Sequence, residues 1–204
     1  MSVLDALAEP APPPDDATSE RILDAALALA AESGLRNLTM DDVARRAGVG
    51  RMTVYRRFGE RQRLVQALTA REAAAFLRRM DAASRPQDPI ADQVAAGFAT
   101  AIRLAREHPL LNRLARIEPD TVVASLRDDG SALFGVCRAY LAERLRQAQR
   151  AGVLAEDAEV DAAAELLVRL AVSFVLIEDT VLPIGDDASA RAVARRLVAP
   201  ILGP

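Results

Sequence analysis

The sequence predicts an all-α protein, and two observations support this fold class. Apolar residues recur at helical spacing from Ser19 to the C-terminus. No run alternates as a half-buried strand would, and no Asn-Gly or Asp-Gly pair joins two such runs. No segment repeats along the 204 residues. We therefore expect about nine helices, arranged as an N-terminal three-helix domain with a helix-turn-helix and a C-terminal helical domain.

Residues 1–18 are expected to form a disordered tail. Pro10 and the run from Pro12 to Pro14 cannot join a helix and have no amide proton to donate. The tail carries acidic residues and no basic one, which argues against an arm that enters a DNA minor groove. The two domains should then occupy residues 19–64 and 65–204.

Capping residues and glycines mark where the helices begin and end. Ser19 is expected to cap the first helix, and Gly34 should end it in a left-handed conformation. Thr39 should cap the second helix, whose first turn holds Asp41 and Asp42, where the helix dipole favours negative charge. The expected helices are 19–33, 40–47, 51–58, 60–83, 90–107, 110–117, 120–127, 131–151, 160–178 and 188–202.

The stretch from Thr39 to Phe58 reads as two helices joined by a tight turn. Ala44 is small where the second helix must cross closely, and Gly48 can adopt the left-handed backbone of the turn. Val54 and Phe58, four residues apart, should face the core. Two helices joined in this way form a helix-turn-helix. Similar pairs also occur in bundles that bind nothing, so the outward-facing side chains matter.

The outward face of the helix at 51–58 is expected to be basic and rich in hydroxyl groups. It would present Arg51, Met52, Thr53, Tyr55, Arg56 and Arg57. Residues 36–63 hold eight arginines against three carboxylates, a local charge of +5, whereas the whole chain carries −3 and has no lysine. Arginine can bond guanine bidentately, and hydroxyl groups suit phosphate oxygens. The positive charge is therefore concentrated where a helix could enter a major groove.

Residues 21–64 resemble the N-terminal DNA-binding domain of the tetracycline-repressor (TetR) family. The matching residues are Glu32-Ser33-Gly34-Leu35, Thr39, Val43-Ala44, Ala47-Gly48-Val49, Thr53-Val54-Tyr55, Phe58-Gly59, Arg61 and Leu64. The resemblance implies an all-α C-terminal domain, a dimer and an inducer pocket. It also implies that Arg51 and Met52 read bases. Phosphate contacts are implied for Thr53, Tyr55, Arg57 and Arg61, with Arg56 as a further candidate and Thr39 among the DNA-binding residues.

Three residues depart from the family's pattern. Gly50 stands where a capping serine is common, which would leave the helix start looser. Met52 replaces a frequent glycine or alanine and adds apolar bulk that can touch a thymine methyl group. Glu60 replaces another common serine, and its charge still suits a helix start. No departure removes a phosphate contact, so DNA binding is expected and the base preference is left open.

The last two helices are candidates for a dimer interface. Residues 160–178 are apolar nearly all round, except for Glu165, Arg169 and Ser173, which read as an ion pair on a narrow solvent face. Residues 188–202 offer small residues that allow close helix approach. We expect both helices to pair with their copies in a homodimer, which suits a pseudo-palindromic DNA operator. The alternative is that they complete a monomeric core.

A small-molecule pocket is expected among the C-terminal helices. The candidate lining residues are Phe98, Arg113, Phe134, Cys137 and Phe174. An apolar cavity with a few polar groups is the usual small-molecule site. The phenylalanines could equally be plain core, and Arg113 could equally be solvated or ion-paired. The stretch HPLLNRLARIEPDTVVASL resembles a subgroup named for a quorum-signal-degradation regulator, which implies an acyl or lactone-like ligand.

Several classes of protein are not supported by the sequence. With one cysteine and one histidine, neither an internal disulfide nor a thiolate–imidazole metal site is expected, and no cofactor is implied. There is no Gly-x-Ser-x-Gly, phosphate loop or paired histidine to indicate an enzyme. No secretory signal or membrane-spanning run is found, so a cytoplasmic location is expected.

The sequence thus predicts a homodimeric regulator, a repressor that a small, largely apolar ligand releases from its DNA operator. An alternative is a helical adaptor that binds only protein, although it would not explain the arginine-rich helix at 51–58. Binding to duplex DNA separates the two.

Overall fold

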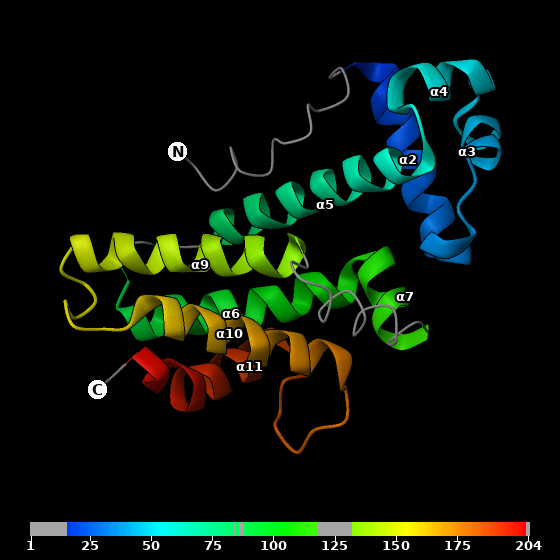
Figure 1. Cartoon of the computed structure of the whole chain (residues 1–204). Coiled ribbons are helices and arrows are strands. Elements are labelled where there is room, and N and C mark those ends of the chain that lie inside the picture. The colour runs from blue at the N-terminus through cyan, green and yellow to red at the C-terminus, as the bar shows by residue number, and fades with distance from the viewer. Residues whose placement is uncertain (1–15, 84, 86–87, 118–131, 203–204) are drawn as a thin grey trace. The chain divides into compact units, whose positions relative to one another are not determined.

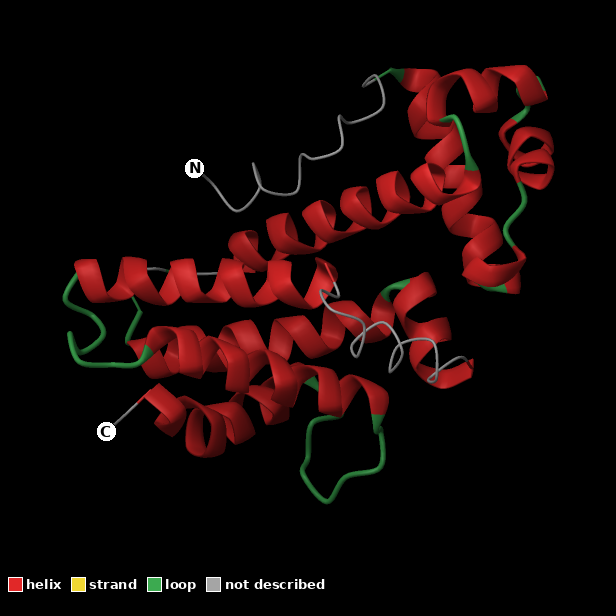
Figure 2. Ribbon diagram, viewed as in Figure 1, coloured by secondary structure: helices red, strands yellow, loops and turns green. Residues whose placement is uncertain are grey.

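The structure is a computed structural model that describes residues 16–83, 85, 88–117 and 132–202. These residues form nine α-helices and no strand, which confirms the all-α prediction (Figures 1 and 2). The elements are α2 (Ala17–Ser33), η1 (Leu35–Asn37), α3 (Met40–Ala47), α4 (Arg51–Phe58), α5 (Arg61–Ala83), α6 (Ile90–Glu107), α7 (Pro109–Ile117), α9 (Ala132–Arg150), α10 (Val160–Leu176), α11 (Asp187–Val193), η2 (Ala194–Val198) and η3 (Ala199–Leu202). No helix of these described ranges is both long and apolar enough to cross a membrane.

The first helix begins earlier than predicted and ends at Ser33, as predicted. It begins at Ala17, and its N-cap is Asp16 rather than Ser19. The Asp16 carboxylate accepts hydrogen bonds from the Thr18 and Ser19 amides at 2.9 and 2.8 Å, so a charged cap two residues earlier satisfies the amides of the first turn. Gly34 ends the helix with a positive φ of 89°, as a glycine cap favours, but its ψ of 155° differs from that of the predicted left-handed helical conformation. Most of the predicted tail, residues 1–15, lies outside the described residues.

Other helix boundaries agree with the prediction to within a few residues. Pro109 is the first residue of α7 instead of separating two helices, since a proline at this position loses no hydrogen bond that the helix needs. The helix predicted at 120–127 lies outside the described residues. The last helix is not uniform: its α-helical part ends at Val193, and a π-helical segment and a 3-10 turn follow.

The chain divides into two compact units, and the division falls inside α5, between Ala75 and Phe76. The first unit contains residues up to 75 together with 109–118. In it, α2 packs against α3, η1 and α7, and α3 packs against α4. Its core includes the fully buried side chains of Ile22, Val43, Val54, Leu64 and Leu68. The predicted domain boundary after residue 64 stays a prediction.

The second unit is built around α6. This helix packs against α10, α11 and η2, and α10 also packs against α9. Its core contains many alanines, such as Ala99, Ala164 and Ala194, beside larger residues such as Ile102 and Leu167. Small side chains let helix axes approach closely, so this unit is held mainly by close apolar packing.

Candidate nucleic-acid interface

Helix α3, which precedes the turn into α4, is capped at both of its ends. The Thr39 hydroxyl accepts a hydrogen bond from the Asp42 amide at 3.1 Å, which confirms the predicted cap. At the other end Gly48 has φ 62° and ψ 38°, the left-handed conformation predicted for it. The Val49 amide donates to the Ala44 carbonyl at 3.1 Å, so the chain leaves α3 in a defined direction. These contacts set the path by which the chain enters α4.

One face of α4 is buried and the other is presented to solvent. Val54 and Phe58 are buried in the core of the first unit, as predicted. On the opposite side the Met52 side chain is 77% exposed, and Arg51 and Arg56 are exposed as well. A single exposed apolar side chain is common on protein surfaces, but Met52 lies beside exposed arginines at the start of α4, where it can contact a partner.

Arg51 is braced by its neighbours on this face. Its Nε lies 2.9 Å from Asp41 Oδ1, and its guanidinium lies over the Tyr55 ring, 5.3 Å from the ring centre. Its Nη2 also lies 3.4 Å from the Tyr55 hydroxyl. Because Arg51 and Asp41 are both well exposed, their ion pair contributes little in water and can exchange for another partner. The structure therefore brings Arg51 and Tyr55 together on the outer face of α4.

Arg57 and Arg61 bond within the first unit. The Arg57 side chain is 18% exposed, pairs with Asp16 and donates to the Ser19 hydroxyl at 3.1 Å. Arg61 donates through Nε to the Leu38 carbonyl at 2.8 Å and through Nη2 to the Leu35 carbonyl at 2.5 Å. The first contact joins α4 to the start of α2, and the second joins α5 to the segment before α3.

The Asp16–Arg57 contact also affects the ionisation of the carboxyl group. The pKa of Asp16 is lowered, first by the Ser19 amide hydrogen bond and then by the hydrogen bond from Arg57. Both interactions favour the carboxylate. The cap of α2 and the anchor of α4 are therefore the same charged group.

Arg56 differs from Arg57 and Arg61. It is exposed, and neither its guanidinium group nor those of Arg36 and Arg63 make a hydrogen bond or an ion pair anywhere in the described part of the chain. The sequence-predicted phosphate contacts thus fall into two groups. The guanidinium groups of Arg57 and Arg61 already have partners, whereas that of Arg56 is available.

Two arginines that the sequence analysis did not single out also hold the helix-turn-helix. Arg21 on α2 donates to the Ala47 carbonyl at 2.6 Å, at the C-terminal end of α3, where a positive charge is favourable. Arg71 on α5 pairs with Glu20 and Asp24 of α2 at 3.1 and 2.8 Å. The partners lie far apart in the sequence, so helical periodicity carries no signal for these contacts.

The five candidate effector residues fall in both units. Arg113 lies on α7 in the first unit, and the other four lie in the second. Phe98 and Phe174 meet edge to face with ring centres 5.8 Å apart, whereas Phe134 lies beneath the guanidinium of Arg169 at 5.4 Å. Burial raises the pKa of the Cys137 thiol to about 11, so this thiol is protonated at neutral pH. Among the five candidate effector residues, the structure thus places the rings of Phe98 and Phe174 in contact.

The predicted ion pair on α10 is present. Arg169 Nη2 lies 2.5 Å from Glu165 Oε1, and Arg138 on α9 adds a second contact to Glu165 at 3.1 Å. Leu166, next to this pair, is half exposed, and so is Leu197 in η2. No group of three or more residues able to hold a metal ion occurs in the described ranges.

Comparisons with known proteins agree with this geometry. Residues 22–68 match the profile of the bacterial regulatory proteins of the tetR family. The chain is 30% identical to Mb2274c, an uncharacterized HTH-type transcriptional regulator of Mycobacterium bovis, over 84% of this chain and 87% of the relative.

Solved structures of the same kind are also similar. The repressor QsdR of R. erythropolis is 26% identical with a TM-score of 0.58, and the match covers 93% of this chain and 96% of that one. The repressor AlkX of Dietzia sp. is 26% identical with a TM-score of 0.60, over 90% of this chain and 94% of the other. Together with the helix-turn-helix and its exposed basic face, these matches place the chain in the TetR family of DNA-binding transcriptional regulators.

Proposed function

We propose that the protein is a cytoplasmic repressor that binds a pseudo-palindromic operator as a homodimer and is released by a small, largely apolar ligand. The observation that carries this proposal is the outer face of α4, where Arg51, Met52 and Arg56 are exposed on a helix whose opposite face is buried. A short helix held outward in this way can enter a major groove, with its first residues against base edges.

The contacts of each side chain suggest its role in DNA binding. Arg51 and Met52, at the start of α4, would read bases, with Arg51 exchanging Asp41 for a guanine. Thr53, Tyr55 and Arg56 would contact phosphate. Thr39, Arg57 and Arg61 have partners inside the first unit, so we expect them to act chiefly by positioning the helices.

The homodimer would form through α10 and the segment that follows Asp187. Leu166 and Leu197, both half exposed, offer apolar surface on these two elements. A two-fold axis would present two copies of α4 about 34 Å apart, which matches two successive major grooves. Residues 160–178 and 188–202 are therefore the proposed interface.

The proposed effector is small and largely apolar. Phe98, Phe134, Phe174 and Cys137, all in the second unit, would provide the apolar surface of its site. Arg113 belongs to the first unit and is a separate candidate for binding an acidic group. Among similar proteins, AlkX is implicated in biodegradation of n-alkanes, and QsdR is a repressor of the TetR family. Because α5 belongs to both units, a ligand that binds better to the state unable to bind DNA can act through this helix.

The test begins with selection of operator sequences from a random DNA pool, followed by mobility shifts at several salt concentrations. Arg51→Ala should relax the preference at one base position by about 1–3 kcal/mol. Arg56→Gln should weaken binding to all sequences and lower the salt slope by about one. Arg78→Gln is the matched control, since Arg78 is exposed on α5 and has no partner in the described ranges.

Three outcomes would contradict the proposal. The first is a failure to bind duplex DNA at low salt, and the second is sedimentation as a single subunit. The third is an equal change of base preference in Arg51→Ala and Arg56→Gln. The first result would favour a protein-binding adaptor, and the third would overturn the division between base and phosphate contacts.

A further inference from the structure

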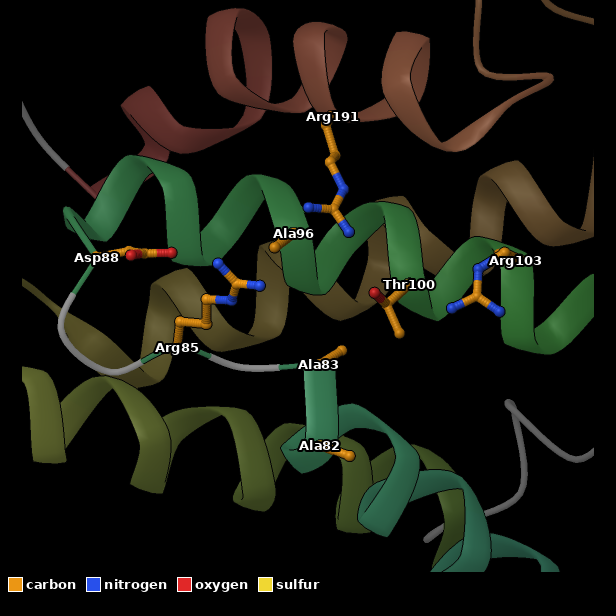
Figure 3. Close-up of a pocket in the computed structure, with 8 residues that line it drawn as sticks. All are labelled: Ala82, Ala83, Arg85, Asp88, Ala96, Thr100, Arg103 and Arg191. Carbon is orange, nitrogen blue, oxygen red and sulfur yellow. The ribbon is translucent and has the colours of Figure 1, made fainter.

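A polar cavity of about 310 Å³ lies within the second unit, between the C-terminal end of α5, α6 and α11 (Figure 3). Its polar lining consists of Arg85, Asp88, Thr100, Arg103 and Arg191, and alanines complete the wall. None of the five candidate effector residues lines it. The chemistry of this cavity is therefore distinct from that of the proposed apolar effector site.

Thr100 gives the clearest indication of a ligand. The residue is 1% exposed, and its hydroxyl oxygen has no hydrogen-bond partner among the described residues. Threonines inside helices commonly donate to the carbonyl one turn back, and buried hydroxyl groups nearly always find a partner. An unpaired hydroxyl at the wall of a cavity therefore calls for an acceptor inside that cavity.

The arginines around the cavity are incompletely neutralised. Arg103 Nε lies 3.1 Å from Asp187 Oδ1, and Arg191 Nη2 lies 3.2 Å from Oδ2 of the same carboxylate. Arg103 also contacts Glu107 at 3.2 Å. The Arg85 guanidinium makes no hydrogen bond or ion pair within the described ranges. Arg191 thus shares its carboxylate, and Arg85 has none.

Figure 3 shows how these groups are directed. The guanidinium groups of Arg85 and Arg191 reach toward each other past Ala96 from opposite sides, and the Thr100 oxygen lies on the same side of α6. Two positive charges directed into one space repel each other unless an anion lies between them. Asp88 lines one edge of the cavity, and its carboxylate forms no ion pair with the three arginines in the described ranges, so it lowers the positive potential there without lying between Arg85 and Arg191.

We propose that this cavity binds the oxyanion of a small molecule, a carboxylate or a phosphate, between Arg85 and Arg191, with the Thr100 hydroxyl donating to it. Guanidinium groups match both oxyanions geometrically and form strong charge-assisted hydrogen bonds with them. The volume lies at the low end for ligand sites, so the ligand is the size of a small metabolite. Asp88 at the edge disfavours a second negative charge near it.

The proposal is tested on the full chain, without DNA, by calorimetric titration and thermal unfolding. The probes are inorganic phosphate and acetate, each at an ionic strength held constant with sodium chloride. Both probes should bind to the wild-type protein, or raise its unfolding temperature, more than chloride does at the same ionic strength. Arg85→Gln should weaken binding at least about fivefold, because it removes one charge-assisted contact. Arg78→Gln, which removes the same charge elsewhere, should leave binding unchanged.

Thr100→Val provides a second and independent test. Valine has nearly the same shape and lacks the hydroxyl, so the variant should fold, unfold at the wild-type temperature or above it without ligand, and bind the probes more weakly. A response to only one probe would support the proposal and narrow the ligand class. A response no greater than that to chloride, or an equal loss in Arg78→Gln, would overturn it. Because no step involves DNA, failure would leave the proposed repressor function intact.

Discussion

The contacts that stabilise the interior of each unit differ between the two units of this protein. In the first, arginine side chains cross from one helix to the backbone or carboxylates of another, as Arg21, Arg61 and Arg71 do. In the second, arginines also cross between elements, as Arg103 does to Asp187 and Arg106 to the Ile184 carbonyl, but the interior consists of alanines and aliphatic residues. Both units thus have directional anchors, and the second unit differs in its alanine-rich, close-packed interior.

This difference matches what each unit has to do. A helix that reads DNA must keep its angle and direction, and hydrogen bonds to carbonyls fix both. Smooth apolar faces fix the distance between helices but allow small sliding movements. We therefore expect the second unit to be the one that changes conformation.

The largest effect is expected from the apolar core of the first unit. Phe58→Ala should lower the free energy of unfolding by about 3–5 kcal/mol, because it removes a buried aromatic ring and leaves a cavity behind α4. Urea denaturation followed by circular dichroism measures it, with Phe58→Leu as the milder control. A loss below about 1 kcal/mol would mean that the polar anchors alone hold α4.

A pair of glycine substitutions should act in opposite directions in the two units. Gly48→Ala should destabilise by about 1–2 kcal/mol, because alanine disfavours the left-handed backbone of the turn. Gly135→Ala lies in α9, where an added Cβ meets nothing within 4 Å, and should stabilise by about 0.5–1 kcal/mol. Thermal unfolding of both variants measures the contrast. Equal effects of the same sign would contradict the view that glycine is needed in the turn at Gly48 and not in the helix at Gly135.

The smallest effect is a pH dependence that separates two helix caps. The pKa values of Asp16 and Asp186 are both lowered, in each case first by a backbone hydrogen bond from a serine. A carboxyl group with a lowered pKa in the folded state stabilises the protein above its unfolded pKa, and this stabilisation is lost as the pH falls through the folded value. Asp16→Asn should therefore be less stable than the wild type at neutral pH, and the gap should close below about pH 4.

Asp186→Asn serves as the matched cap in the other unit. Arg57 adds to the lowering at Asp16, whereas no arginine contributes at Asp186, so the gap for Asp186→Asn should be smaller. The urea unfolding midpoints of both variants and the wild type, measured from neutral to acidic pH, test this difference. A gap at Asp16 that persists unchanged in acid would show that the Asp16–Arg57 contact does not depend on charge.

Local patterns in the sequence predicted most of the helix-turn-helix. Thr39, Gly48 and the bounds of α4 follow from short-range signals, namely a capping hydroxyl, a glycine turn and apolar spacing. The cap at Asp16 was missed because Ser19 offered a competing cap nearby. The spacing of Val54 and Phe58 was sufficient to place them in the core.

Contacts between distant segments were not predicted. The partners of Arg57 and Arg61 lie 41 and 23 residues away, and no periodic pattern reports them. The cavity beside Thr100 was also not predicted, because its arginines come from separate segments that no periodic pattern connects. The π-helical segment at 194–198 left no recognisable signal in the sequence either.

The length of α5 has a mechanical consequence. Its 23 residues make a rod about 34 Å long, with one end in each unit. If one end pivots by about 10°, the other end swings by about 6 Å, which exceeds the rise of a single DNA step, about 3.4 Å. A tilt that costs the second unit little would thus be magnified enough to misalign α4 with its groove.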